Sequence, residues 1–322
     1  HPCETACRRN FYDEPLADSS ALPTFLLSEL TRKHVTVALN GDGGDESFAG
    51  YERYADCGFG IFNTWRRVPR PLRKWMVGPV SHALHAALPR SGRLELIDYV
   101  NRASLLDANA RYCEAMRFFR QSQKRRLYSR ELLGRLGGAL PEDPMLATIR
   151  AMEGLGDRAH RIDRMALADF TGYLPDCLMV KADRATMAHG LEGRSPFLDQ
   201  HVVEFAAGLP AELRMLGGDL KGLLRKYAAP LFPPGHLDRP KKGFTLPVRE
   251  WFRDGLHRVG IEMLLSSRQA ERGLFDRNYI RLLLDQHRRG TQNHHYRLWA
   301  LVVFELWCRT YLDADGSAPI SI

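Results

Sequence analysis

This sequence of 322 residues contains no long hydrophobic run, so we expect no membrane-spanning helix within it. No apolar stretch reaches the ~18 residues that such a helix needs, and no signal-peptide pattern follows His1. The six cysteines are scattered, and Cys3 and Cys7 have no second pair to complete a zinc site. These absences predict a cytoplasmic protein with reduced thiols. Because the first residue is not Met, we expect a fragment of a longer protein.

Sequence signatures of nucleic-acid binding are also missing, although the net charge is +8. No zinc-finger, RRM or KH pattern is present. Basic residues cluster in 64–75 and 120–132, but they alternate there with apolar residues at helical spacing. We interpret both segments as solvated helix faces and expect neither nucleic-acid nor membrane partners. A basic nucleic-acid-binding module stays as an alternative class of function.

The segment 35–54, VTVALNGDGGDESFAGYERY, organises the rest of the chain. It opens with an apolar, β-branched run (Val35–Leu39), breaks at Asn40 and Gly41, and resumes in an amphipathic stretch. This pattern predicts a buried strand, a glycine-rich turn and the start of a helix. In open α/β sheets, ligands bind beyond the carboxyl ends of the strands, which is where this turn would lie.

The turn combines three glycines with three carboxylates, namely Gly41, Gly43, Gly44, Asp42, Asp45 and Glu46. Glycines let backbone N–H groups approach a ligand, and a helix N-terminus favours anions. Clustered carboxylates would repel a phosphate unless a divalent cation lay between them. Mg²⁺ is bound by one or two carboxylates together with substrate phosphates, so we predict Asp45 and a pyrophosphate as its ligands. The alternative is a polar turn whose carboxylates cap the next helix; an EF-hand is excluded because its residue order is absent.

The order of elements around this turn indicates part of an α/β unit. A Ser/Asp cluster and Pro23 predict a helix that runs to Arg32 and leads into the strand. One strand is too few for a sheet, so the chain is expected to begin within a domain. We predict an α/β part over 1–58 and a mainly helical part over 59–322.

Helical spacing of apolar residues recurs along the second part. It predicts helices over 72–88, 94–112 and 122–136, and a buried aromatic helix over 296–311.

The segment 173–210 mixes charged with apolar residues. Its charged side chains include Lys181, Asp183, Arg184, Glu192, Arg194 and Asp199. Charges amid apolar residues must find partners, so the pattern predicts partly buried ion pairs. Asp199 is predicted to cap a helix over 201–207. A salt-bridged core without catalytic function is the alternative for most of these residues.

The segment 220–252 carries two groups of basic residues. Lys221, Arg225 and Lys226 lie near one face of a predicted helix. Arg239, Lys241 and Lys242 precede Gly243 in a short loop, which suits neutralisation of phosphate charge. An ordinary solvated loop is the alternative.

Four stretches resemble the synthetase domain of glutamine-dependent asparagine synthetases. Residues 37–54 resemble its S-G-D-G-G-D-E-x-F-x-G-Y-x-R-Y segment, and Asp13–Pro23 resembles D-E-P-x-x-D-S-S-x-x-P. Residues 173–199 are similar to Y-L-P-D-x-x-L-x-K-x-D-R-x-[ST]-M-A-x-x-L-E-x-R-x-P-F-L-D, and 239–244 to R-P-K-x-G-F. The resemblance extends from Asp13 to Tyr311.

The resemblance implies a fold and a partial domain. Residues 1–322 would form the C-terminal part of an adenine-nucleotide α-hydrolase-like (PP-loop) α/β domain, with a small parallel-sheet remnant and mostly helices. The family's S-G-G-x-D-S nucleotide loop and glutaminase cysteine are absent from this sequence and are expected upstream. The chain alone is therefore expected to be inactive.

The resemblance also implies an activity, that of a glutamine-hydrolysing asparagine synthase. ATP adenylates a carboxylate, expected to be the aspartate side chain, and pyrophosphate leaves. Ammonia, produced from glutamine by a glutaminase domain, then attacks to give asparagine. ATP and Mg²⁺ are the implied cofactors, and a homodimer is compatible with the resemblance. Alternatives are a related cyclase or amidotransferase acting on another carboxylate, as in β-lactam synthetase and lasso-peptide cyclases, and a non-catalytic scaffold subunit.

Roles for individual residues follow from the same resemblance. Asn40, where the family usually has serine, would contact ATP with Gly41, Gly43 and Lys241, and Asp45 would bind Mg²⁺. Asp42 would orient or deprotonate the incoming amine, and Lys241 would also meet the developing intermediate. The supporting residues are expected to be Glu46, Asp183, Arg194 and Lys221.

Overall fold

A computed structural model describes residues 12–56, 68–69, 71–72, 103–141, 143–154, 160–239, 243–244 and 246–313. Helices dominate this part of the chain, and its two strands form one parallel sheet, so the chain belongs to the α/β class only in a coarse sense. None of the helices in these ranges has both the length and the hydrophobicity to span a bilayer.

The parallel sheet joins segments far apart in the sequence. β1 (Val37–Leu39) pairs with β2 (Glu192–Arg194), and Leu39 lies opposite Arg194. The predicted order of helix, strand and turn is confirmed, with α2 (Ala21–Arg32) before β1. The predicted burial of the strand is wrong, because Leu39 is 73% exposed. Val37 is also exposed, at 39%.

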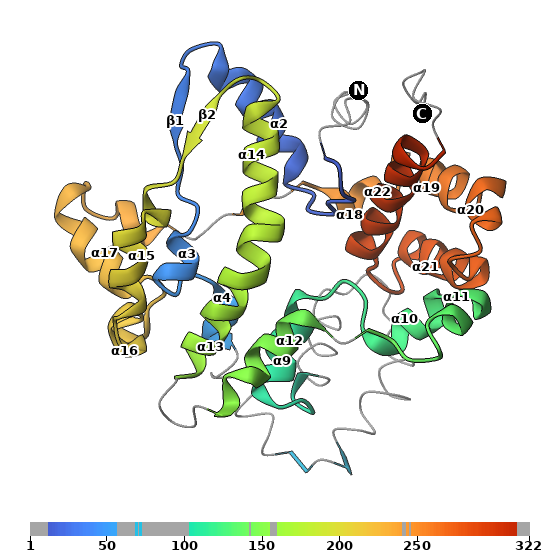
Figure 1. Ribbon diagram of the computed structural model, residues 1–322, viewed down its shortest axis with the longest axis horizontal. Coiled ribbons are helices and arrows are strands. Elements are labelled where there is room, and N and C mark those ends of the chain that lie inside the picture. The colour runs from blue at the N-terminus through green and yellow to red at the C-terminus, as the bar shows by residue number, and fades with distance from the viewer. Residues whose placement is uncertain are drawn as a thin grey trace.

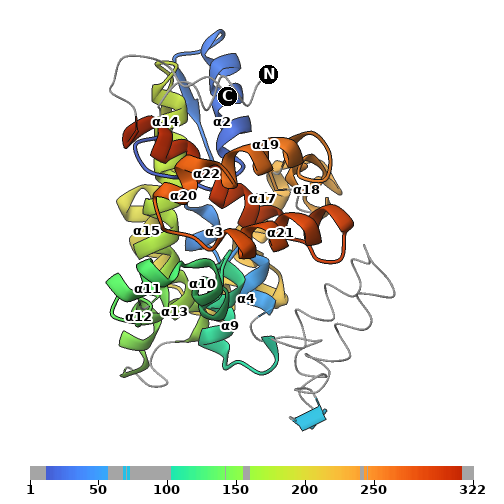
Figure 2. The ribbon, with the colours of Figure 1, turned by 90° about the vertical axis from the view of Figure 1, so that its right-hand side faces the viewer.

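The turn after β1 leads into two short helices, α3 (Gly44–Ser47) and α4 (Glu52–Asp56). Gly43 has a φ of +85°, a conformation that strongly favours glycine, and a Cβ there would lie 2.2 Å from Cδ2 of Leu198. In both views α3 lies below the sheet and above α4 and α13 (Figures 1 and 2).

A continuous helical rod forms the middle of the molecule (Figure 1). It consists of α13 (Arg161–Ala168), the π-helix η3 (Asp169–Met179) and α14 (Val180–Met187). Pro175 lacks a backbone N–H and so cannot continue an ordinary α-helical ladder, which is consistent with the wider turns of η3. At the C-terminal end of the rod, α14 packs against α2, beside the sheet (Figure 1).

Short helices follow β2. They are η4 (Pro196–Leu198), α15 (Gln200–Ala207), α16 (Ala211–Arg214), η5 (Leu216–Gly218), α17 (Gly222–Ala228), η6 (Ala229–Leu231) and η7 (His236–Asp238). The predicted cap is confirmed, because the Asp199 carboxylate accepts a hydrogen bond from the His201 N–H at 2.9 Å. Lys221 precedes α17 with a φ of +55°, so this lysine lies outside the helix predicted to carry it.

A second group of helices packs against the N-terminal end of the rod, at α13. It consists of α12 (Pro144–Ala151), which contacts α13 and η3, and α9 (Ala108–Met116), which contacts α12. Next in the chain after α9 come α10 (Gln121–Leu127) and α11 (Arg130–Arg135), and α10 contacts the C-terminal helix α21 instead. The helix predicted over 122–136 is split, because the Ser129 hydroxyl caps α11 and Tyr128 forms a bridge with Phe275. Most of the helix predicted over 72–88, and the first part of that predicted over 94–112, lie outside the described residues.

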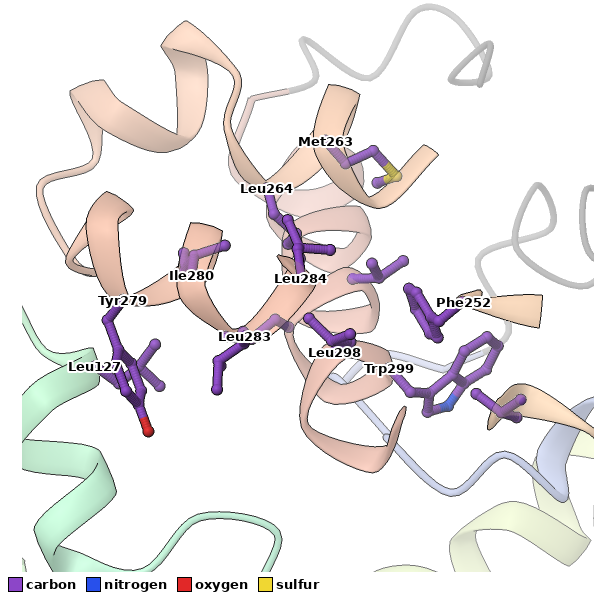
Figure 3. Close-up of a cluster of buried hydrophobic side chains, with 13 residues drawn as sticks. Leu127, Phe252, Met263, Leu264, Tyr279, Ile280, Leu283, Leu284, Leu298 and Trp299 are labelled. Carbon is purple, nitrogen blue, oxygen red and sulfur yellow. The ribbon is translucent and has the colours of Figure 1, made fainter. Parts of the chain in front are cut away.

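The C-terminal helices enclose a hydrophobic core (Figure 3). They are α18 (Val248–Trp251), α19 (Gly255–Leu264), α20 (Ser267–Glu271), α21 (Arg277–Arg289) and α22 (His295–Tyr311). Leu284 of α21 and Leu298 of α22 are almost completely buried in it. The helix predicted over 296–311 is therefore confirmed.

Histidines at the junction of α21 and α22 make stability sensitive to acid. The buried His294 ring accepts a hydrogen bond from Arg297 and contacts the Gln286 amide oxygen at 2.8 Å. Burial, reinforced by Arg297, lowers the His294 pKa to about 3, and burial lowers that of His295 to about 4. Both rings are thus neutral in the folded state at pH 5, whereas in the unfolded chain they protonate near pH 6.5.

We expect the free energy of unfolding to fall as the pH drops below 6.5. His294 alone contributes a loss of about 1.4 kcal/mol per pH unit down to its folded pKa; His295, which is more exposed, contributes less. Urea unfolding at pH 7 and pH 5 measures the difference. His294→Gln should reduce this pH dependence, and His201→Gln, on an exposed side chain of α15, should leave it unchanged. Equal pH dependence in wild type and His294→Gln would contradict the assignment.

Candidate active site

The acidic glycine turn begins where both strands end. The Asn40 N–H donates to the Arg194 carbonyl at 2.8 Å, which extends the β1–β2 ladder by one residue. The Asn40 side-chain oxygen accepts hydrogen bonds from the Asp42 N–H at 3.2 Å and from the Ser195 hydroxyl at 2.6 Å. Asn40 thereby fixes the turn between the two strand ends. A Cβ on Gly41 would meet nothing within 4 Å, so this side of the turn is open.

Asp45 and Lys221, distant in sequence, meet beside the turn. The Lys221 ammonium lies 3.1 Å from a carboxylate oxygen of Asp45, and both side chains are partly exposed. Gly50 backs this pair, because a Cβ there would lie 2.0 Å from the Asp45 carboxylate and 2.2 Å from Cε of Lys221. A larger residue at this position would therefore displace the Asp45–Lys221 pair.

Asp42 presents a half-buried carboxylate on the same turn. Within the described residues, no hydrogen bond reaches its side-chain oxygens. Burial raises its pKa above the ordinary value; the Lys181 ammonium opposes this rise, and the Asp45 carboxylate adds to it. The Asp42 carboxylate is therefore influenced by one positive charge, that of Lys181, and one negative charge, that of Asp45.

Lys181 is held by two side chains from the segment before α2. Its ammonium lies 2.8 Å from the Asp18 carboxylate and 2.8 Å from the Ser20 hydroxyl. Burial alone would raise the pKa of Asp18, but Lys181 outweighs it, so the pKa is lowered. The ion pairing predicted for 173–210 is confirmed for Lys181, and it links α14 to the chain before α2.

Glu46 points into the protein. It is 1% exposed, and the Tyr51 hydroxyl donates a hydrogen bond to it at 2.5 Å. Burial raises its pKa above the usual range. This burial suits a structural role better than contact with a ligand.

The other predicted supporting residues lie at the surface. Asp183 is exposed on α14. Arg194 is exposed at the end of β2 and pairs with Glu192 at 2.8 Å. Neither side chain makes a described contact with the turn. Lys241 lies outside the described residues, so its predicted contact with phosphate stays a prediction.

Sequence reasoning missed a buried polar network behind the turn. Arg53 pairs with Asp169 at 2.8 Å, and the Tyr54 hydroxyl donates to the same carboxylate. Asp169 is completely buried at the start of η3. The signal was present in the G-Y-x-R-Y end of the motif, whose Tyr51, Arg53 and Tyr54 all lie in this network.

In the turn, the carboxylates of Asp45 and Asp42 are the oxygen donors suited to Mg²⁺. Across the described ranges, no three His, Cys, Asp or Glu side chains gather closely enough to hold a metal by themselves. Mg²⁺ keeps several waters and takes one or two carboxylates with substrate phosphates, so a site for it needs fewer than three such side chains. The residues of the turn therefore fit this cation when a phosphate is also bound.

Comparisons with known proteins show which sequences this chain is similar to. A family model described as asparagine synthase matches residues 4–309. A putative glutamine-hydrolysing asparagine synthetase of Mycobacterium bovis is 33% identical over 97% of this chain and 45% of its own length. Asparagine synthetase 1 of Bacillus subtilis is 29% identical over 92% and 44%, and the amidase chry2 of Gibberella zeae is 21% identical over 83% and 40%. The chain thus spans a little under half the length of these relatives.

Proposed function

The chain belongs to the asparagine synthase family, and from that premise we propose that it carries the site at which ATP activates a carboxylate for amide formation. The observation that carries the proposal is the turn itself, where Asp42 and the Asp45–Lys221 pair meet at the carboxyl end of β1. We place β1 and β2 in a sheet of the adenine-nucleotide α-hydrolase-like (PP-loop) kind.

The first proposed step is adenylation of the substrate carboxylate. A carboxylate oxygen attacks the α-phosphorus of ATP, and the bond from that phosphorus to the bridging oxygen of pyrophosphate breaks. Mg²⁺ at Asp45 would supply neutralisation of the phosphate charge. Gly41 leaves room for close approach of the backbone, and Asn40, Gly43 and Lys241 are the further ATP contacts.

The second proposed step forms the amide. Ammonia attacks the acyl carbon of the adenylate, the carbon–oxygen bond to AMP breaks, and the nitrogen gives up a proton. The half-buried Asp42 carboxylate, with its raised pKa, is the group that would orient the ammonia and accept this proton. We propose aspartate as the substrate and a glutaminase domain as the source of ammonia, which together give asparagine.

Pyrophosphate release by the full-length protein tests this function. Aspartate, glutamate, a sugar acid and an acyl amino acid would each be supplied with ATP, Mg²⁺ and either glutamine or an ammonium salt. We expect pyrophosphate and amide to form in equal amounts with aspartate. No release with any carboxylate would contradict the proposal and favour a non-catalytic scaffold subunit.

A second candidate is amide formation or ring closure on another carboxylate. The relative named amidase chry2 favours it, because proteins similar to this chain are not all named asparagine synthetases. Release of pyrophosphate with a different acid, but not with aspartate, would select this candidate.

A further inference from the structure

Arg53 of α4 lies in a cage of tyrosine rings behind the acidic turn. The central carbon of its guanidinium is 3.5 Å from the ring centre of Tyr51 and 5.1 Å from that of Tyr173. Its Nε donates a hydrogen bond to the Tyr112 hydroxyl at 3.2 Å. Only 16% of this side chain is exposed, so the charge is held largely away from water. Stacking of a guanidinium on an aromatic face is stronger when the pair is desolvated.

Asp169 supplies the negative charge that pairs with Arg53 in this cage. An outer nitrogen of the Arg53 guanidinium lies 2.8 Å from the Asp169 carboxylate, which also accepts a hydrogen bond from the Tyr54 hydroxyl. Because Asp169 is the first residue of η3, the contact ties α4 to the central helical rod. The segment carrying the acidic turn is thereby fastened to the most continuous element of the molecule.

Arg53 reaches the turn through Tyr51. The face of the Tyr51 ring packs on the guanidinium, while its hydroxyl donates to buried Glu46, the neighbour of Asp45. The Gly50 N–H also donates to the Asp45 carbonyl at 2.8 Å, which closes residues 45–51 into a compact loop. A shift of Tyr51 would therefore move Glu46 and, with it, Asp45.

We propose that Arg53 is a positioning residue for the acidic turn. Its ion pair with Asp169 and its stack on Tyr51 hold Asp45 at the place where a cation and phosphate are to be bound. The role of the turn rests on the proposed function, whereas the mechanical link from Arg53 to the turn does not. Lysine does not reproduce this arrangement, because an ammonium does not stack as a plane and has one nitrogen in place of the two with which Arg53 reaches Tyr112 and Asp169.

The test compares Arg53→Lys with Arg117→Lys in the full-length protein. Arg117 and Asp143 form an ion pair of similar burial, 18% and 16% exposed, between α9 and α12, with no described contact to the turn. Hydrogen exchange followed by mass spectrometry would report on residues 41–50, and pyrophosphate release would be measured across Mg²⁺ concentrations.

We expect Arg53→Lys to speed exchange in 41–50 and to raise the Mg²⁺ concentration for half-maximal rate. Its turnover should fall on the order of 100-fold, the typical effect of a displacement of about 1 Å in a reacting centre. Arg117→Lys should resemble wild type in all three measurements. If Arg53→Lys does not fold, Tyr51→Phe keeps the ring, removes the bond to Glu46, and should speed exchange in the same segment.

Two results would overturn the inference. One is unchanged exchange in 41–50 in both Arg53→Lys and Tyr51→Phe. The other is the same loss in Arg53→Lys and Arg117→Lys, which would indicate general destabilisation. A wild-type protein that releases no pyrophosphate would defeat the proposed function instead, while exchange in the variants would still decide whether Arg53 holds the turn.

Discussion

Asp45→Ala in the full-length protein is expected to lower the rate of pyrophosphate release by about 10²–10³-fold, the usual effect of removing one electrostatic contact to a transition state. The carboxylate is the proposed cation ligand of the turn, and its loss also leaves the Lys221 ammonium without its partner. Stability should change by less than about 1 kcal/mol, because both side chains are partly exposed. Pyrophosphate release and thermal unfolding, measured on the same preparation, separate the two effects.

The control for this prediction is Glu29→Ala, on an exposed side chain of α2. It removes one negative charge without touching the turn, and we expect wild-type rates. Asp45→Asn should be nearly as slow as Asp45→Ala, since the amide keeps the shape but not the charge. An Asp45→Ala protein with normal turnover would remove this residue from the site.

Gly222→Ala is expected to destabilise the fold by about 3 kcal/mol, at the upper end for overpacking. A Cβ at this position would lie 2.3 Å from the carbonyl oxygen of Leu216 and 2.5 Å from its nitrogen. These are backbone atoms, so no side-chain rotation can relieve the clash. Because Gly222 follows Lys221, the repacking should also pull the lysine away from Asp45. Urea denaturation measures the first effect and pyrophosphate release the second.

Gly134→Ala is the matched control for that substitution. A Cβ on Gly134, within α11, would meet nothing within 4 Å, and alanine favours helix. We expect a gain of about 0.5–1 kcal/mol in the free energy of unfolding. If both alanines had the same effect, the close approach of Gly222 to Leu216 would not matter to the fold.

Local sequence predicted well those parts of the site that lie on one short segment. The order of strand, turn and helix around residue 40 follows from an apolar run that ends in glycines and carboxylates. The Asp199 cap and the aromatic helix α22 were predicted for the same reason, because their signals are contiguous.

Long-range partners were not predictable in this way. Nothing near Asp45 indicates that it meets Lys221, because that contact depends on the left-handed backbone of Lys221 and on the small size of Gly50 and Gly222. The burial of β1 was mispredicted because an apolar strand does not reveal what covers it. Pro175 ordinarily signals the end of a helix, and here the chain continues through it as a π-helix.

The central rod imposes a constraint on how this gene can change length. Asp169 at the start of η3 binds Arg53, whereas Lys181, just after its end, binds Asp18. One contact is therefore at the start of η3 and the other just beyond its end. Deleting one codon between them would rotate one contact relative to the other by roughly a quarter of a turn. Small in-frame deletions between residues 170 and 180 should therefore be selected against, even where no side chain there touches a substrate.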